Sequence, residues 1–464
     1  MIRKRAGQRS FSDAILFGAH IPDPKTLLDP VLRRLDEVLD SDDLVDEVLG
    51  ALRKRHPQSS RRGRPGTPAE VALRLLVLKH VRQWSFEELQ WEVTGNVAYR
   101  AFCRIDSGKV PDSKTMIRIN QAVDEATLRR VFERVVEEAK RRKVTRGRKM
   151  RVDTTVVETG VRYPLDSGLC EDVTRVACRE MERVRAAGLP VPDTFRNVRR
   201  SVARRLYEIE QIGRRPTSRE AKLEALKKPY KRLLRVAARV VRQARAVVEA
   251  SKRLRRTIPG EIARSLRVLE GIVTTGKQVV AQTRARILRG ETKSEGKLVS
   301  IFEPHTQIIR KGKKHKPTEF GRTVKVQEAE GGVVTDIAVV DVSDSALVHS
   351  SIEAHKKHFG RVPAVVSADR GFYSTVNIAR ASEMGVLHVV IPKPGHRSDA
   401  VREKERARSF RRARAWRAGG EARISRLKRT FGMARSRYRG EAGLARCTYW
   451  AAIANNLVAI ARAQ

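Results

Sequence analysis

The sequence lacks long apolar runs and has few cysteines. No stretch reaches the roughly 18 consecutive apolar residues that identify a membrane-spanning helix, so no membrane partner is expected. The basic N-terminal stretch, MIRKRAGQRSFSDAILFGAHIP, has a short, broken apolar part and no small-residue cleavage site, and we do not interpret it as a signal peptide. Cys103, Cys170, Cys178 and Cys447 are scattered and form no CxxC pair. This spacing argues against a zinc site and a disulfide framework and favours a reducing cytoplasm.

Acidic residues are scarce beside basic ones. The 464-residue chain has 97 Lys and Arg against 53 Asp and Glu, which gives a formal net charge of +44. Its isoelectric point is about 11.1. Such an excess creates a positive field that attracts polyanions, of which nucleic acid is the commonest large one. Because hydrophobic residues make up 41% of the chain, large cores can form, and we expect two or three folded domains.

Residues from about 27 to 140 are predicted to be helical. The stretch DPVLRRLDEVLDSDDLVDEVLGALRKR repeats apolar residues at three- and four-residue spacing, as an amphipathic helix does. After the polar break HPQSSRRGRPGTPAE, further helical segments follow, with capping residues at Ser85 and Asp112. Short helices with tight turns can contain a DNA-binding helix-turn-helix, and an ordinary helical bundle explains the pattern equally well. We predict an all-α, DNA-binding N-terminal domain at 1–140.

A strand pattern begins near residue 150. The segment MRVDTTVV is rich in valine and threonine, which suit a half-buried pleated surface, and contains one aspartate, which does not. Further strands are predicted near 323–328, 333–342, 364–368 and 387–391, with a glycine-containing hairpin turn at 330–332. Helical segments alternate with the later strands, which indicates a mixed α/β sheet.

Residues 161–296 are predicted to form a long, arginine-rich helical insertion. In RLLRVAARVVRQARAVVEASKRL, Leu233, Val240 and Val247 are seven residues apart, as in a coiled coil. The other sides of this helix carry arginines, whose mutual repulsion a bound polyanion would offset. We expect DNA contact here, with a dimerisation arm as the alternative use of the apolar stripe. The arginines expected to bind DNA are Arg235, Arg239, Arg242 and Arg245.

Two predicted strands carry a carboxylate that needs a partner. Asp153 lies within the strand near 150–158, and Asp369 ends the strand AVVSAD. The carboxyl ends of strands are where open α/β sheets place their ligand sites. Two close carboxylates repel unless a divalent cation lies between them, and Mg²⁺ is bound by one or two carboxylates together with substrate phosphate oxygens. The pattern favours metal-assisted phosphodiester chemistry; the alternative makes Asp369 a helix cap and Asp153 an edge-strand residue.

Three blocks, VDTTVVE, VVSADRGFYS and RAGGEARISRLKRTFGMARSRYRG, carry a family resemblance. They resemble the signature blocks of DDE transposases from bacterial insertion sequences, whose catalytic domain has an RNase H-like, integrase-type fold. The segments GRPGTPAEVALRLLVLKHVRQWSFEELQWEV and VPDSKTMIRI resemble the N-terminal helical domain of that family. The resemblance covers residues from about 60 to 158 and from about 297 to 464 and leaves out the arginine-rich middle.

The resemblance implies that Asp153, Asp369 and Glu421 are the catalytic acids and the metal ligands. It implies two Mg²⁺ ions, with Mn²⁺ as a substitute. Among nearby acids, Asp341 is kept as a lesser candidate, whereas Asp344 is interpreted as a helix cap and Glu158 as a residue flanking the site.

The third block also implies cations for DNA. Arg417, Glu421 and Lys428 keep the family's spacing, and Arg414 stands where the family usually has tyrosine. Four- and seven-residue spacing places Arg417 and Lys428 on roughly the same helix face as Glu421. We count Arg417, Lys428 and Arg370 among the DNA-binding residues.

These expectations describe a DNA transposase. Metal-dependent hydrolysis would release a 3′-hydroxyl, and that hydroxyl would attack target DNA. The expected fold is an α/β catalytic domain, an RNase H-like mixed sheet with helices, at 144–160 and 297–464, interrupted by the helical insertion. The expected partners are double-stranded DNA and further copies of the chain assembled on it, at the bacterial nucleoid in the cytoplasm. The alternatives are an inactive or domesticated DNA-binding protein and a nuclease on the same fold; three intact acids favour an active enzyme.

Overall fold

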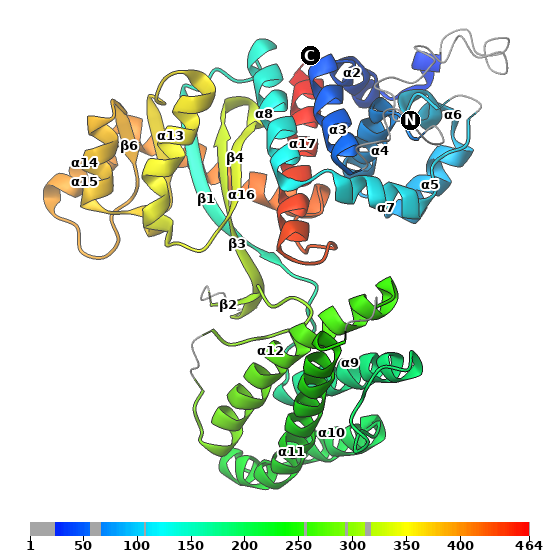
Figure 1. The fold of residues 1–464 in the computed structure, drawn as a ribbon. Helices are drawn as coiled ribbons and strands as arrows, with labels where there is room; N and C mark the ends of the chain where they lie inside the picture. The colour runs from blue at the N-terminus through cyan, green and yellow to red at the C-terminus, as the bar shows by residue number, and fades with distance from the viewer. Residues whose placement is uncertain are drawn as a thin grey trace. The chain divides into compact units, whose positions relative to one another are not determined.

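The computed structural model describes residues 24–55, 66–105, 108–254, 258–292, 296–310 and 317–463. The stretch compared with a signal peptide and most of the polar break after residue 55 lie outside these residues. The chain divides into two compact units (Figure 1). Unit 1 comprises Met1–Glu158 and Arg322–Gln464, and unit 2 comprises Thr159–Gly321.

Unit 1 begins with helices, as the amphipathic spacing predicts. They are α2 (Pro30–Leu39), α3 (Asp42–Arg55), α4 (Ala69–Arg82), α5 (Phe86–Gly95), α6 (Val97–Phe102), α7 (Ser113–Ala122) and α8 (Glu125–Arg141). Ser85 forms a capping box with Glu88 at the start of α5, and Asp112 accepts a hydrogen bond from the Thr115 amide at the start of α7. Both predicted caps are therefore confirmed, and each is worth about 1 kcal/mol of helix stability.

The strands of unit 1 lie in one mixed sheet. They are β1 (Lys149–Glu158), β3 (Glu319–Ala329, whose first residues belong to unit 2), β4 (Val334–Val340), β5 (Val365–Ala368) and β6 (His388–Val390). β4 pairs antiparallel with β3, β3 lies beside β1, and β5 pairs in parallel with both β1 and β6. The predicted strands are confirmed in one sheet. Because β1 lies between β3 and β5, the interpretation of Asp153 as an edge-strand residue is wrong.

The turn between β3 and β4 requires glycine. Gly331 and Gly332 have φ angles of 73° and 75°, in the left-handed region that side chains with a Cβ rarely adopt. A Cβ on Gly331 would lie 2.1 Å from the carbonyl oxygen of Val144. The preceding Glu330 accepts a hydrogen bond of 2.8 Å from the Lys149 amide, the first residue of β1. The turn therefore fixes the start of the strand that carries Asp153.

Helices cover both faces of this sheet. On one face, Met150 and Val152 of β1 share a core with Leu347 and Ile352 of α13 (Leu347–Phe359), which is joined by α14 (Thr375–Glu383). α16 (Arg408–Thr430), preceded by α15 (Asp399–Arg406), contacts β1, β5 and β6. The last helix, α17 (Glu441–Ala463), packs against α2, α4, α8 and β4. The N-terminal helices and the sheet consequently share one hydrophobic core.

Unit 2 is a helical bundle with one short strand. Its elements are α9 (Asp166–Ala186), α10 (Arg199–Arg214), α11 (Arg219–Lys252), α12 (Gly260–Leu288) and β2 (Gln307–Ile309), which pairs with the first residues of β3. Leu233, Val240 and Val247 of α11 are fully buried in the core that the helices of this unit form. The apolar stripe therefore faces its own bundle, which removes the reason for assigning it to a second subunit. Over the described residues of both units, no helix is long and apolar enough to cross a membrane.

Candidate active site

Asp153 points toward the face of the sheet that α16 covers. Side chains alternate between the two faces of a strand. Met150 and Val152 are buried in the core with α13, so Arg151 and Asp153 lie on the opposite face. The Asp153 side chain is 25% exposed, and its Oδ1 accepts a hydrogen bond of 2.7 Å from the Thr154 amide. The carboxylate thus lies at the surface of a central strand, where a second group can reach it.

Asp369 lies beside Asp153 across neighbouring parallel strands. Val152 of β1 is paired with Ala368, the last residue of β5. The next residue on each strand is an aspartate. Asp369 is half-buried, and its Oδ1 accepts a hydrogen bond of 2.7 Å from the Arg370 amide, which begins a 3₁₀ turn. Asp369 therefore is a cap, as the alternative interpretation held, and its place in the chain directly follows the residue paired with Val152.

Arg417 of α16 lies between Asp153 and Glu421. Its Nη1 is 3.7 Å from Asp153 Oδ2, and its Nη2 is 3.6 Å from Glu421 Oε1. The Glu421 side chain is 73% exposed, whereas the Arg417 side chain is only 18% exposed. One guanidinium thus brings together an acid of the sheet and an acid of the helix.

The carboxylates suit a hard divalent cation. Oxygen donors of this kind are the ligands of Mg²⁺ and Mn²⁺, and the Arg417 guanidinium already places a positive charge between Asp153 and Glu421. Within the described parts of the chain, no three Asp, Glu, His or Cys side chains are close enough to bind one ion together. In this arrangement Glu421 is paired with Arg417.

A buried ion network holds α16 on the sheet. Glu328 of β3 is 3% exposed, and its Oε2 lies 2.7 Å from Arg151 Nη2 while its Oε1 lies 3.0 Å from Arg423 Nε. The Arg151 guanidinium also stacks 4.6 Å from the Trp416 ring centroid and donates to the Trp416 carbonyl. A Cβ added at Gly419 would lie 2.7 Å from Arg151 Nη1, so a larger residue there would displace this guanidinium.

This ion network joins the two segments that carry Asp153 and Glu421. Arg151 precedes Asp153 by two residues on β1, and Arg423 follows Glu421 by two on α16. Glu328 ties these two segments together and so helps to hold α16 beside the strand that carries Asp153. Glu328 was not predicted from the sequence, although one signal was present: strand alternation places Arg151 on the Asp153 face, and a buried arginine there requires a carboxylate.

The competing acids have other partners. Asp341, after β4, lies 2.6 Å from Arg322. Asp344 does not act as the predicted helix cap: its Oδ1 accepts a hydrogen bond of 2.9 Å from the Thr154 hydroxyl, and the turn after Asp369 approaches its carboxylate closely at Gly371. Glu158 pairs through its backbone with residues after α16. Asp344 thus supports the loops around the two aspartates from the other face.

The remaining DNA-binding predictions concern exposed or half-buried cations. Arg370 is exposed and Lys428 is half-buried two turns beyond Glu421. In unit 2, considered by itself, the α11 arginine stripe lies on the exposed side of its helix, and between Glu224 and Glu249 that helix has no acidic residue. No described residue forms an ion pair or hydrogen bond with any member of the stripe. The α11 arginine stripe consists of Arg235, Arg239, Arg242 and Arg245.

Two family models match the chain. The Transposase domain (DUF772) matches residues 17–122, which hold α2 to α7, and the Transposase DDE domain matches residues 297–457, which hold β3 to β6, Asp369 and Glu421. No curated protein and no solved structure matches it. A DDE domain belongs to enzymes that act on DNA phosphodiester bonds, and the two matches together span more than half of the residues. The chain therefore belongs to the DDE-type transposases of insertion sequences and is a DNA transposase.

Proposed function

We propose that Asp153, Asp369 and Glu421 hold two Mg²⁺ ions, or Mn²⁺ in their place, and that this site cuts DNA at the ends of a mobile element and joins them to target DNA. The parallel register of β1 and β5 is the observation that carries this assignment, because it puts two carboxylates at neighbouring positions. When bound, the ions would act as Lewis acids at the attacking and leaving oxygens of an in-line displacement.

We assign the catalytic domain to the RNase H-like fold. In its support, an antiparallel pair, β3 and β4, adjoins the parallel strands β1, β5 and β6, with helices on both faces. The three acids come from the central strand, the end of its parallel neighbour and a helix. The proposed domains are a DNA-binding domain at 1–140, the catalytic domain at 144–160 and 297–464, and the insertion at 161–296.

Protein cations would hold the DNA at this site. Arg417 lies within 4 Å of two carboxylates and offers a planar fork of donors that fits phosphate oxygens. Lys428 and Arg370 would add phosphate contacts on either side. Contacts of this type position the DNA backbone and carry no sequence information.

The two chemical steps need no covalent bond to the protein. Water attacks the phosphorus at the element end, the P–O bond breaks, and a 3′-hydroxyl is released. That hydroxyl then attacks a target phosphodiester, and one P–O bond again replaces another. The cysteines offer no alternative nucleophile, since all four are buried and burial raises the pKa of each thiol.

The α11 arginine stripe would bind the DNA backbone outside the catalytic site. Between Glu224 and Glu249 the helix has eight basic residues and no carboxylate, so its own charges repel and phosphate neutralisation relieves them. We further propose that the enzyme acts as a homo-oligomer assembled on element ends, in the cytoplasm at the nucleoid.

Incubation with Mg²⁺ and DNA that carries the element's own ends tests this function. We expect cleaved ends and products in which those ends are covalently joined to a second DNA. Cleavage without joined products would identify a nuclease instead, and neither product, with DNA still bound, would identify an architectural protein.

A further inference from the structure

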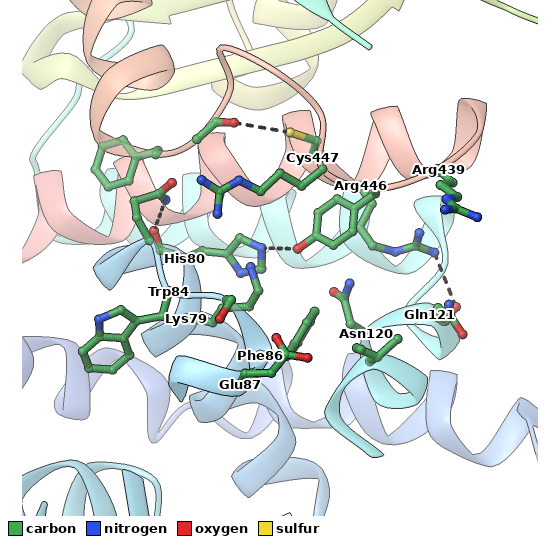
Figure 2. A pocket seen from close by; sticks show the side chains of 17 residues that line it. Lys79, His80, Trp84, Phe86, Glu87, Asn120, Gln121, Arg439, Arg446 and Cys447 are labelled. Atoms are coloured by element: carbon green, nitrogen blue, oxygen red, sulfur yellow. Dashed lines mark hydrogen bonds between the residues drawn. The ribbon is translucent and has the colours of Figure 1, made fainter. Parts of the chain in front are cut away.

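Unit 1 contains a second site, a pocket that none of the three acids lines. It has a volume of about 380 Å³, within the size range of small-ligand pockets. α4, α5 and α7 form one side, and the loop after α16 with the start of α17 forms the other (Figure 2). Both sides belong to unit 1, and their hydrophobic residues share one core.

Positive charge dominates the lining of this pocket. Lys79, Arg437, Arg439 and Arg446 all line it, against Glu87 as the single acid among the lining residues. Lys79, Arg437 and Arg439 have no hydrogen bond or ion pair with any described residue. Arg446 donates to the Gln121 carbonyl at 3.4 Å, but its buried Nε has no acceptor among the described residues.

Aromatic rings surround the same cations. The Lys79 ammonium lies 4.9 Å from the Phe86 ring centroid and 5.6 Å from that of Tyr438. Trp84 lines the pocket, and its ring is held edge-on against Tyr99 at 5.1 Å. A planar apolar group that enters the pocket can therefore meet an aromatic ring, and Lys79 lies over two of these rings.

The polar groups at the back of the pocket are already satisfied. His80 Nδ1 lies 2.6 Å from the Leu76 carbonyl, which can only accept, so Nε2 accepts from the Tyr438 hydroxyl at 2.9 Å (Figure 2). Burial lowers the pKa of His80 well below its usual value, in keeping with a neutral ring. Asn120 accepts from the Trp450 indole at 3.1 Å. The unused hydrogen-bonding capacity thus belongs to the cations.

Lys79 is costly to keep in this place unless an anion binds. Burial lowers its pKa to about 8 and the charge of Arg437 adds to that effect, although the nearby Cys447 and the exposed Glu88 partly offset it. A methionine or leucine would fill the same space between the two rings without a desolvated charge. The cation therefore points to a ligand rather than to packing.

We propose that this pocket binds one unpaired nucleotide, with its phosphate held by Lys79 and Arg437 and its base stacked on Trp84. Base stacking on aromatic side chains and backbone contacts from cations are how proteins hold single strands. A paired nucleotide cannot enter, because its base is covered by the stack, so the nucleotide comes from a single-stranded or flipped position in DNA or is free in solution.

The test measures binding of an end-labelled oligothymidylate to the full chain in EDTA, at raised salt to suppress the non-specific term. Binding in EDTA does not depend on the metal-holding acids, so failure here and failure of the catalytic assignment are distinguishable. The variants are Lys79→Met and Arg437→Gln. The control changes an exposed arginine at the end of α3, Arg53→Gln, which removes the same charge.

We expect both pocket variants to bind the single strand about tenfold more weakly than wild type, and the control to change little. Binding of a blunt duplex should fall no further in the pocket variants than in the control. If thymidine monophosphate competes with the labelled oligothymidylate at the same concentrations as unlabelled strand, the ligand of the pocket is a free nucleotide. If only the unlabelled strand competes, the ligand is a nucleotide within DNA. Equal effects in pocket and control variants, or competition by inorganic phosphate as strong as that of the nucleotide, would overturn the proposal.

Discussion

Removing the charge of Glu328 is the sharpest perturbation of the catalytic scaffold. In Glu328→Gln the side-chain shape is kept, but Arg151 and Arg423 lose the carboxylate that lies 2.7 Å and 3.0 Å from them. Their side chains are only 10% and 15% exposed, so water replaces the lost partner poorly. Breaking a buried pair by removing one member costs about 3–5 kcal/mol. Because Arg423 also donates to Asn455 at 2.9 Å, we expect the lower end of that range.

The same change should reduce activity more than stability alone explains. Without Glu328, α16 is free to move relative to β1, and a displacement of about 1 Å at a catalytic group can cost a hundredfold in rate. We expect strand transfer to fall about a hundredfold at a temperature where the variant is still folded. DNA binding should stay close to wild type, because the α11 arginine stripe and the other phosphate contacts are unchanged.

Urea unfolding followed by tryptophan fluorescence measures the stability change, since Trp416 stacks on Arg151. Glu137→Gln is the matched control: it breaks an ion pair whose side chains are 57% and 44% exposed, and such pairs are worth at most about 1 kcal/mol. Adding Arg423→Gln to Glu328→Gln removes one unpaired cation and should restore part of the loss. If Glu328→Gln unfolds at the same urea concentration as the Glu137 control, the network does not hold α16 in place.

Further predictions concern the DNA-binding surfaces and the packing around the acids. Changing all members of the α11 arginine stripe to glutamine should reduce the slope of log K against log salt on duplex DNA by about 3.6, at about 0.9 for each phosphate contact. The control makes the same change at four exposed cations of α12. Equal slopes for the two variants would show that the α11 arginine stripe has no special role in DNA binding. The pKa of Lys79 falls from 10.5 in the unfolded chain to about 8 in the folded one. Between these two pH values, Lys79 therefore binds more protons in the unfolded chain than in the folded one. Lys79→Met should therefore raise the free energy of unfolding at pH 7 by up to about 3 kcal/mol, and this gain should disappear as the pH rises from 8 toward 10.5. An equal gain in the free energy of unfolding at both ends of that pH range would contradict the burial of the Lys79 charge. Gly419→Ala should lower strand transfer by pushing the Arg151 guanidinium away, although alanine stabilises a helix by about 1 kcal/mol relative to glycine. The control is Gly50→Ala in α3, where an added Cβ meets nothing within 4 Å, and it should leave strand transfer unchanged. The α12 control cations are Arg264, Arg267, Lys277 and Arg284.

Local patterns in the sequence were sufficient for the strands and for the two aspartates that they carry. A segment rich in valine and threonine predicted β1, and the carboxylate after AVVSA marked the end of β5, because both signals act within a few residues. The caps at Ser85 and Asp112 were predicted for the same reason: a capping side chain bonds an amide two or three residues away.

Contacts between distant segments were beyond the sequence. Glu328 reads as an ordinary acid in a strand, and only the sheet shows that it meets arginines 177 and 95 residues away. Asp344 was interpreted as a cap because of its position before a helix, whereas its partner, the Thr154 hydroxyl, comes from a strand 190 residues earlier. The heptad spacing of α11 identified a buried stripe but not its partners, which are the other helices of unit 2.

The role of the three acids is best tested by single isosteric variants in one strand-transfer assay. Asp153→Asn, Asp369→Asn and Glu421→Gln keep side-chain shape and remove the charge that would hold Mg²⁺. Each is measured for cleavage and joining of element ends in Mg²⁺, and for binding of the same DNA in EDTA. We predict that every variant loses both reactions while its DNA affinity stays within a few fold of wild type, because phosphate contacts supply the affinity. A variant that still cuts and joins DNA at near the wild-type rate would show that its residue is not part of the catalytic site.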